Sequence, residues 1–163
     1  MKKYKIAAFA VLAAVLSVSL SGCWWNNKFA KVEPMDELNA ENLYHYQNKD
    51  LGFEMYLPQD FIYYQTQRNN NDDFSDLIIY VPTADTSLPT ELQSYAKPVI
   101  VRIFNKKYWD ESLNDEEREG YVKVGEKGDK VYTLLFWQKI PSDWTVKWTD
   151  DMKQTIIDNF QVK

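Results

Sequence analysis

The first 23 residues decide which part of this chain can enter a folded domain. Lys2, Lys3 and Lys5 form a basic N-terminal region, and residues 6–20 are apolar apart from two serines. An apolar run of about 15 residues is shorter than the ~20 that span a bilayer, but it matches the apolar core of a secretory signal peptide. Small residues and the only cysteine, Cys23, follow at once. The pattern predicts that residues 1–22 are removed and take no part in the fold.

The residues Leu20, Ser21, Gly22 and Cys23 resemble the lipobox of bacterial lipoproteins: a leucine, a small residue, a glycine or alanine, and a cysteine. The resemblance implies that the three residues before the cysteine direct signal-peptidase cleavage after Gly22. It also implies that the Cys23 thiol receives a diacylglyceryl group and that the new N-terminus is acylated, with palmitate as the expected acyl group. A thiolate is nucleophilic enough for this thioether chemistry. Several acyl chains anchor a protein stably, so we expect an extracytoplasmic protein lipid-anchored to a bacterial membrane.

Residues 23–42 are predicted to be the lipidated N-terminus and a flexible tether. They are polar, contain Pro34 and show no sustained hydrophobic period. As a coil, ~19 residues have a mean reach of about 25 Å, which keeps the domain near the membrane. Trp24 and Trp25 directly follow the lipidated cysteine, and indole rings are enriched at membrane interfaces. These two residues are therefore candidates for a membrane-interface contact, with an ordinary linker as the alternative.

The composition after residue 22 disfavours several partners. Without the three lysines of the leader, the chain has 16 Lys and Arg against 24 Asp and Glu, a formal charge of about −8. Such a charge argues against nucleic-acid binding and against electrostatic binding to anionic lipid. With Cys23 lipidated, no thiol remains for a disulfide or a cysteine metal site, so packing must hold the domain together.

Residues 43–163 are expected to form a single α+β domain. Apolar runs bounded by turn residues predict strands at 44–47, 53–57, 61–67, 77–81, 99–104, 121–125 and 131–138. A polar loop is predicted at 68–75, a short helix at 88–95 and helical turns at 106–119, where Asn114 and Glu117 form a capping-box pair. The last element is predicted to be an amphipathic helix capped by Thr149, with an apolar stripe of Met152, Ile156, Ile157 and Phe160.

The two ends of this domain resemble those of PsbP-like domains. The opening run is NKDLGFEMYLP at 48–58, and the closing run is IIDNFQV at 156–162. The resemblance implies a PsbP-like sandwich, in which an antiparallel β-sheet is covered by helices and is closed by a C-terminal helix and a short terminal segment. That family shares no catalytic site, so no functional residue carries over. The implied role is accessory or binding, in an extracytoplasmic complex.

Three features bear on catalysis and metal binding, and each has a simpler interpretation. His45 is the only histidine and has no nucleophile motif near it, so we expect an exposed strand residue. Residues 69–73 (NNNDD) carry oxygen ligands at calcium-loop spacing, but Phe74 and Tyr80 occupy the positions of the turn glycine and the bidentate glutamate. The acidic run at 110–119 is typical of a solvated helix face. No catalytic residue, metal ligand or cofactor is predicted.

The leading hypothesis for function is a non-enzymatic role: a lipid-anchored protein that binds a protein or a component of the cell envelope. One alternative is an envelope hydrolase that acts on glycan or peptide through a pair of carboxylates. Another is a sugar or peptide binder that uses exposed aromatic rings, for which Trp137, Trp144 and Trp148 are the residues to inspect.

Overall fold

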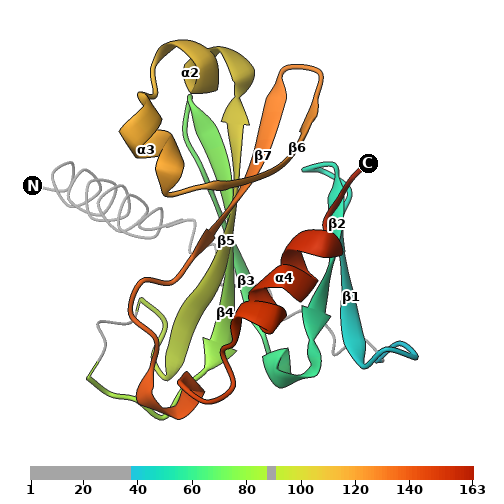
Figure 1. The fold of residues 1–163 in the computed structure, drawn as a ribbon, viewed down its shortest axis with the longest axis vertical. Coiled ribbons are helices and arrows are strands. Elements are labelled where there is room, and N and C mark those ends of the chain that lie inside the picture. The colour runs from blue at the N-terminus through green and yellow to red at the C-terminus, as the bar shows by residue number, and fades with distance from the viewer. Residues whose placement is uncertain (1–37, 88–90) are drawn as a thin grey trace, which may run out of the picture.

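The computed structural model describes residues 38–87 and 91–163, which form an α+β fold with two antiparallel sheets (Figure 1). The smaller sheet has the strand order β1-β2-β8, and the larger has the order β3-β4-β5-β7-β6. The strands are β1 (Leu43–Asn48), β2 (Phe53–Pro58), β3 (Gln65–Asn70), β4 (Phe74–Pro82), β5 (Tyr95–Asn105), β6 (Val122–Lys127), β7 (Lys130–Phe136) and β8 (Gln161–Val162). The helices are α2 (Lys106–Glu111), α3 (Asp115–Glu119) and α4 (Asp150–Asp158), with short 3-10 helices at Gln59–Phe61 and Ser142–Trp144.

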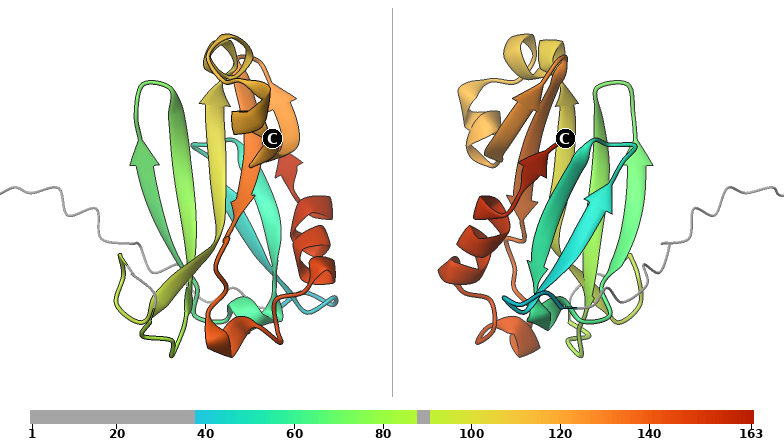
Figure 2. Two further views of the ribbon diagram at one scale, coloured as in Figure 1. Left: turned by 60° about the vertical axis from the view of Figure 1, so that its left-hand side comes forward. Right: turned by 90° about the vertical axis from the view of Figure 1, so that its right-hand side faces the viewer.

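The main core lies between the two sheets. The inner face of the five-stranded sheet packs against the three-stranded sheet and α4, which lie side by side as a second layer (Figure 2). The prediction of one sheet covered by helices therefore needs correction, because β1 and β2 form a separate sheet that covers much of the inner face. The fully buried side chains of this core include Phe53, Met55, Leu57, Ile79, Val99, Val101, Leu134 and Ile156.

Helix α4 is positioned by its N-terminal cap and by its apolar stripe. The Thr149 hydroxyl accepts a hydrogen bond from the Met152 N–H at 3.1 Å, as the sequence indicates. Ile156 is fully buried, and the ring of Phe160 stacks on Phe53 with centroids 5.0 Å apart. The chain then continues into β8, which pairs antiparallel with β2, so the chain ends beside the opening strands of the domain.

The predicted strand at 61–67 is wrong in its first half. The chain forms the 3-10 helix Gln59–Phe61, and the Tyr64 N–H then bonds to the Phe61 carbonyl. Phe61 points into the core, whereas Ile62 and Tyr63 are exposed and Tyr63 has a φ of +62°. Phe61 and Tyr64 are both buried although they lie three residues apart, a spacing that places them on opposite faces of a strand, so the chain turns here instead.

The predicted polar loop at 68–75 is too long, because residues 68–70 belong to β3 and residues 74–75 to β4, which form a hairpin. Only residues 71–73 turn, and the Asn71 side-chain oxygen accepts hydrogen bonds from the N–H groups of Asp73 and Phe74 at 2.9 and 2.8 Å. β3 is polar because it lies at the edge of the sheet, where polar side chains discourage further strand pairing.

One local prediction in the β5–β7 region is confirmed, and a glycine turn lies nearby. Asn114 and Glu117 form a reciprocal capping box at the start of α3, with both hydrogen bonds 2.9 Å long. A tight hairpin connects β6 and β7, and Gly128 at its turn has a φ of +61°, a conformation that favours glycine.

The described chain begins with a turn rather than with β1. The Asn39 side-chain oxygen accepts hydrogen bonds from the N–H groups of Glu41 and Leu43, and Leu38 bridges to Tyr44. Residues 38–42, assigned by prediction to the end of the tether, are thus ordered against β1. The predicted leader, Cys23, Trp24 and Trp25 lie outside the described residues. Within the described ranges, no helix has the length and apolar character needed to cross a membrane.

Candidate functional site

The outer face of the five-stranded sheet, which points away from the main core, is divided into two halves. In the half that we call the covered half, α2 and α3 lie over the sheet beside the β6–β7 hairpin (Figure 1). Its small aromatic core consists of Phe104, Trp109 and Val131, with Phe74, Tyr108, Leu113 and Tyr121 packed around them. In the other half, the open half, the outer side chains of β5 and β7 are partly exposed.

A partly buried ion pair forms the boundary between the two halves. The Arg102 guanidinium donates from Nε and Nη2 to the two carboxylate oxygens of Asp76, both at 2.7 Å, and from Nη1 to the Tyr121 hydroxyl at 2.8 Å. It lies 3.8 Å above the ring of Phe74. Asp76 is only 6% exposed. The two parallel hydrogen bonds fix the orientation of the guanidinium and of the carboxylate. Through Tyr121, the pair also connects β4 and β5 to the segment that covers the sheet.

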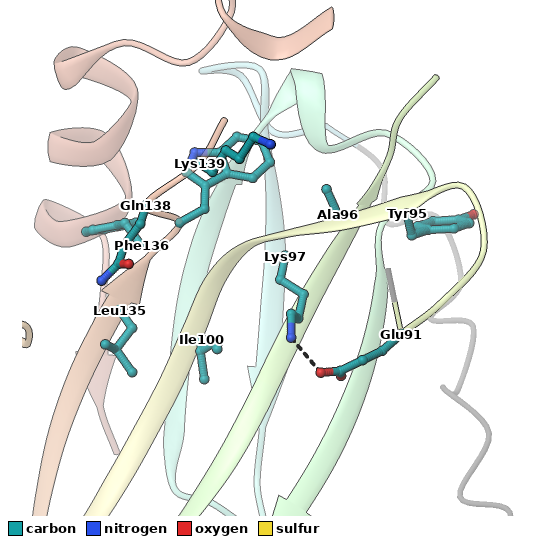
Figure 3. A pocket seen from close by; sticks show the side chains of 10 residues that line it. Glu91, Tyr95, Ala96, Lys97, Ile100, Leu135, Phe136, Gln138 and Lys139 are labelled. Atoms are coloured by element: carbon teal, nitrogen blue, oxygen red, sulfur yellow. Dashed lines mark hydrogen bonds and ion pairs between the residues drawn. The ribbon is translucent and has the colours of Figure 1, made fainter. Parts of the chain in front are cut away.

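The open half contains a groove of about 500 Å³, a size typical of small-molecule sites. Figure 3 shows its lining from close by, with Ile100 of β5 and Leu135 of β7 next to each other. The apolar part of the lining comprises Tyr95, Ala96, Ile100, Leu135, Phe136 and Trp137. The polar part comprises Glu91, Lys97, Gln138 and Lys139.

A β-bulge at the start of β5 shapes one side of this groove. Ile79 pairs with Val99 and Val81 pairs with Ala96, so Tyr80 alone faces two residues, Lys97 and Pro98. A proline is tolerated at a bulge because its missing N–H removes no ladder hydrogen bond there. The predicted strand start at residue 99 is therefore wrong: β5 begins at Tyr95 and passes through the bulge.

The polar side chains on this side of the groove bind one another. Lys97 Nζ donates to Glu91 Oε1 at 2.7 Å, and the Tyr80 hydroxyl lies 2.8 Å from Gln67 Oε1 and 3.1 Å from Glu91 Oε2. The hydrogen bond from Lys97 lowers the pKa of Glu91. Burial, reinforced by the charge of Glu91, raises the pKa of Tyr80 well above its usual value. Glu91 is therefore ionised and Tyr80 neutral at physiological pH, which leaves neither poised as an acid or a nucleophile.

Of the three tryptophans considered as binding residues, only Trp137 lines the groove. Trp144 and Trp148 are 2% and 6% exposed and belong to the main core. Their rings pack edge-on against Trp137 at centroid distances of 5.6 and 5.0 Å. The Trp144 indole N–H donates to the Pro82 carbonyl at 2.9 Å. Trp144 and Trp148 thus hold Trp137 in place from behind and are not accessible to a ligand.

Asp143 holds the loop after β4 against the 3-10 helix Ser142–Trp144. Its carboxylate accepts the Thr83 hydroxyl at 2.7 Å and the Ala84 N–H at 2.9 Å. Burial acts to raise the pKa of Asp143, but the hydrogen bonds from Ala84 and Thr83 outweigh it and leave the pKa below its usual value. The carboxylate is therefore a fixed acceptor and stays ionised near neutral pH.

Asp85 holds the same two segments from the other side. It accepts hydrogen bonds from the Ser87 hydroxyl at 2.6 Å and the Ser142 N–H at 2.8 Å, and these lower the pKa of its carboxyl. A hydrolase with two carboxylates needs one acid whose pKa is raised, so that it can donate a proton. Asp85 and Asp143 are both shifted the opposite way, which fits a structural role in holding the loop.

The other candidates from the sequence lie away from the groove. His45 is exposed on β1, where it stacks on Tyr56 at 4.8 Å and lies 3.4 Å from a carboxylate oxygen of Glu54. The calcium-loop candidate is the β3–β4 turn, whose Asn71 oxygen is occupied by backbone N–H groups. The carboxylates of α3 are exposed, as expected of a solvated helix face. Among residues 38–87 and 91–163, no three side chains of the metal-binding types cluster to form a site.

The groove could not be predicted from the sequence, because residues that are far apart in the chain form its floor. Ile100 and Leu135 read as ordinary alternating strand residues. The one local signal is Lys97-Pro98 directly before an apolar run, since a proline there favours a bulge. No family model, no curated protein and no solved structure matches this chain.

Proposed function

We propose that this chain is a lipid-anchored extracytoplasmic protein with a non-enzymatic binding role, directed at a protein or a component of the cell envelope. The lipobox-like residues Leu20, Ser21, Gly22 and Cys23 carry the anchoring part of the proposal. The open half of the outer face carries the binding part. A sheet face that is covered by its own helices at one end and partly exposed at the other offers a preformed surface for a partner.

The chemistry of the groove favours binding over catalysis. Glu91 is the one carboxylate among the described lining residues, and Lys97 engages it at 2.7 Å. A hydrolase that uses two carboxylates needs a second acid within ~10 Å that holds a proton. For the alternative of a sugar or peptide binder, Trp137 and Tyr95 line the groove, whereas Trp144 and Trp148 are buried in the core.

We also propose that the domain is a PsbP-like sandwich, in which a second small sheet shares with α4 the cover of the five-stranded sheet. The two runs that carry the resemblance, 48–58 and 156–162, lie next to each other: Phe53 pairs with Val162 and Glu54 pairs with Gln161. The order of a terminal helix followed by a short terminal strand fits the implied architecture. The proposal is supported by the positions of these two runs and by the order of the terminal elements. It gives no residue a functional role.

The anchor is tested by labelling with a palmitate analogue in a bacterial host that makes the full chain. We expect the parent to incorporate the label and to fractionate with membranes. Cys23→Ala should lose the label, because the thiol is the proposed site of thioether formation. Equal labelling of the two proteins would refute the lipid anchor.

The binding role is tested by pull-down of the full chain from detergent-solubilised membranes. Leu135→Glu places a charge on the floor of the groove, whereas Lys107→Glu changes a charge on α2 over the covered half. We expect one stoichiometric component to be recovered with the parent and with Lys107→Glu, and to be lost with Leu135→Glu. Equal recovery with all three proteins would refute binding through the open half.

A further inference from the structure

We propose that the groove of the open half binds a long-chain fatty acid, with the hydrocarbon chain along the floor and the carboxylate at Lys139. This inference rests on the proposed binding role and names the class of ligand. It follows from the hydrogen-bonding groups that the groove lacks, from the apolar residues that line it and from the charge at one end.

The backbone of the floor offers few hydrogen bonds to a ligand that lies on the face of the sheet. β5 is paired with β4 and β7, whereas β6 pairs with β7 only as far as Leu134, so Leu135 and Phe136 have a strand partner on the β5 side alone. An extended peptide that binds by strand addition needs a free sheet edge for its own N–H and C=O groups. A peptide laid across this face would leave its backbone groups unpaired on an apolar surface, which is costly.

The side chains of the floor also favour hydrocarbon. Ile100, Leu135 and Phe136 carry no polar side-chain atom, and two of the polar residues of the lining, Glu91 and Lys97, are engaged with each other. A sugar would need several free donors and acceptors for its hydroxyl groups, since an unpaired buried polar group costs more than the contact returns. A methylene chain needs none, and each buried methylene group tightens binding about four-fold.

Charge selects the head group. Lys139 is exposed and takes part in no ion pair within the described ranges, while Lys97 is paired with Glu91. The groove lining therefore carries one uncompensated positive charge in a chain whose formal net charge is −5. Figure 3 places Lys139 at one end of the groove and Ile100 toward the other. An amphiphile with one anionic head and one apolar chain matches this layout.

The test uses isolated membranes that contain the full chain and a palmitic acid probe with a diazirine in its hydrocarbon chain. After illumination, the cross-linked residues are located by peptide mass spectrometry. We expect cross-links within 95–100 and 135–139, and competition by unlabelled palmitic acid. Cross-links confined to other segments, or undiminished by the competitor, would overturn the proposal.

One variant, one control probe and one control variant separate ligand recognition from folding. Lys139→Glu should lower labelling by the acid about five-fold or more, because a favourable ion pair becomes a repulsive one. Labelling by the matching uncharged diazirine alcohol should stay within about two-fold of the parent, which shows that the groove is intact. Lys107→Glu makes the same charge change over the covered half and should leave both probes unaffected. An equal loss of both probes in Lys139→Glu, or no loss of either, would refute head-group recognition.

Failure of this proposal is distinguishable from failure of the proposed function. If the pull-down still depends on Leu135 but the fatty acid labels nothing in the groove, the open half is a binding surface and the ligand class is wrong. If the pull-down does not respond to Leu135→Glu and the fatty acid labels nothing in the groove, both proposals are wrong.

Discussion

Phe104 and Ile100 lie four residues apart on the same face of the same strand, yet their surroundings differ. Phe104 is 1% exposed, because Tyr108 and Trp109 of α2 pack on its ring. Ile100 is partly exposed and lines a groove. The strand itself therefore does not decide which outer residues are buried. The connection between β5 and β6 decides it, because that segment folds back over only one half of the sheet.

The boundary between the halves shows why the groove keeps its shape. The Asp76–Arg102 pair links β4 to β5 and is itself fixed by Tyr121, which precedes β6. On the other side, the bulge at Lys97 and Pro98 bends the start of β5. The open half is thus framed by two features that stabilise its backbone without covering its side chains.

The largest effect on stability is expected for a substitution in the main core. This core lies against the inner face of the five-stranded sheet, behind both halves. Phe160→Asp would place a charge against Phe53 in the main core, among apolar side chains. Burying an unpaired charge costs several kcal/mol, and a domain of this size has only about 5–15 kcal/mol of stability. We expect loss of the cooperative thermal transition in circular dichroism.

Phe160→Leu is the matched control, because it keeps an apolar side chain at the same position. It should retain a cooperative transition at a lower temperature. A Phe160→Asp variant that melts within a few degrees of the parent would contradict the assignment of this core.

The covered half should respond strongly to loss of a single ring. Phe104→Ala removes the side chain on which Phe74, Tyr108 and Trp109 pack. We expect a loss of ~3–5 kcal/mol in the free energy of unfolding, measured by urea titration, as for other large-to-small core changes. Recovery of the partner in the pull-down should be unchanged at temperatures where the variant is folded.

The loop beside the open half should show a dependence on pH. Because the pKa of Asp143 is lower in the folded state, its stabilising contribution is present above the usual Asp value of about 4 and is lost as the pH falls through the folded pKa. Asp143→Asn should therefore melt below the parent at pH 7, and the difference should shrink toward pH 3. A difference that stays constant from pH 7 to pH 3 would contradict this role.

The smallest effect on stability is expected in the open half. Leu135 is only partly buried, so Leu135→Ala should cost about 1 kcal/mol or less in the same urea titration. Phe104→Ala in the covered half should therefore lower the free energy of unfolding several times more than Leu135→Ala in the open half. A cost near that of Phe104→Ala would show that the open half is part of the core, and the groove would lose its significance.

Features that depend on neighbouring residues were predictable from the sequence. The Thr149 cap and the Asn114–Glu117 capping box are local hydrogen-bond patterns, and the structure contains both. The polar turn before β7 is marked by Gly128, whose positive φ few other residues adopt without strain. Such signals are independent of what packs against them.

Features that depend on distant residues were not predictable. Phe61 reads as the start of a strand, but its burial in the main core turns the chain there. The polar residues of β3 read as a loop because a strand at a sheet edge lacks the usual apolar alternation. The groove depends on the register of β5 and β7, which places Ile100 opposite Leu135, and on where α2 and α3 lie. None of these is set by a local pattern.

The most direct test of the open half as the binding surface is carbene footprinting of the full chain, compared between native membranes and the protein purified from them. We expect the outer residues Ile100 and Leu135 to be protected in membranes and labelled after purification. Tyr108, over the covered half, should be labelled to the same extent in both samples. Equal labelling of Ile100 and Leu135 in the two samples would contradict the proposal that a partner or ligand occupies the open half.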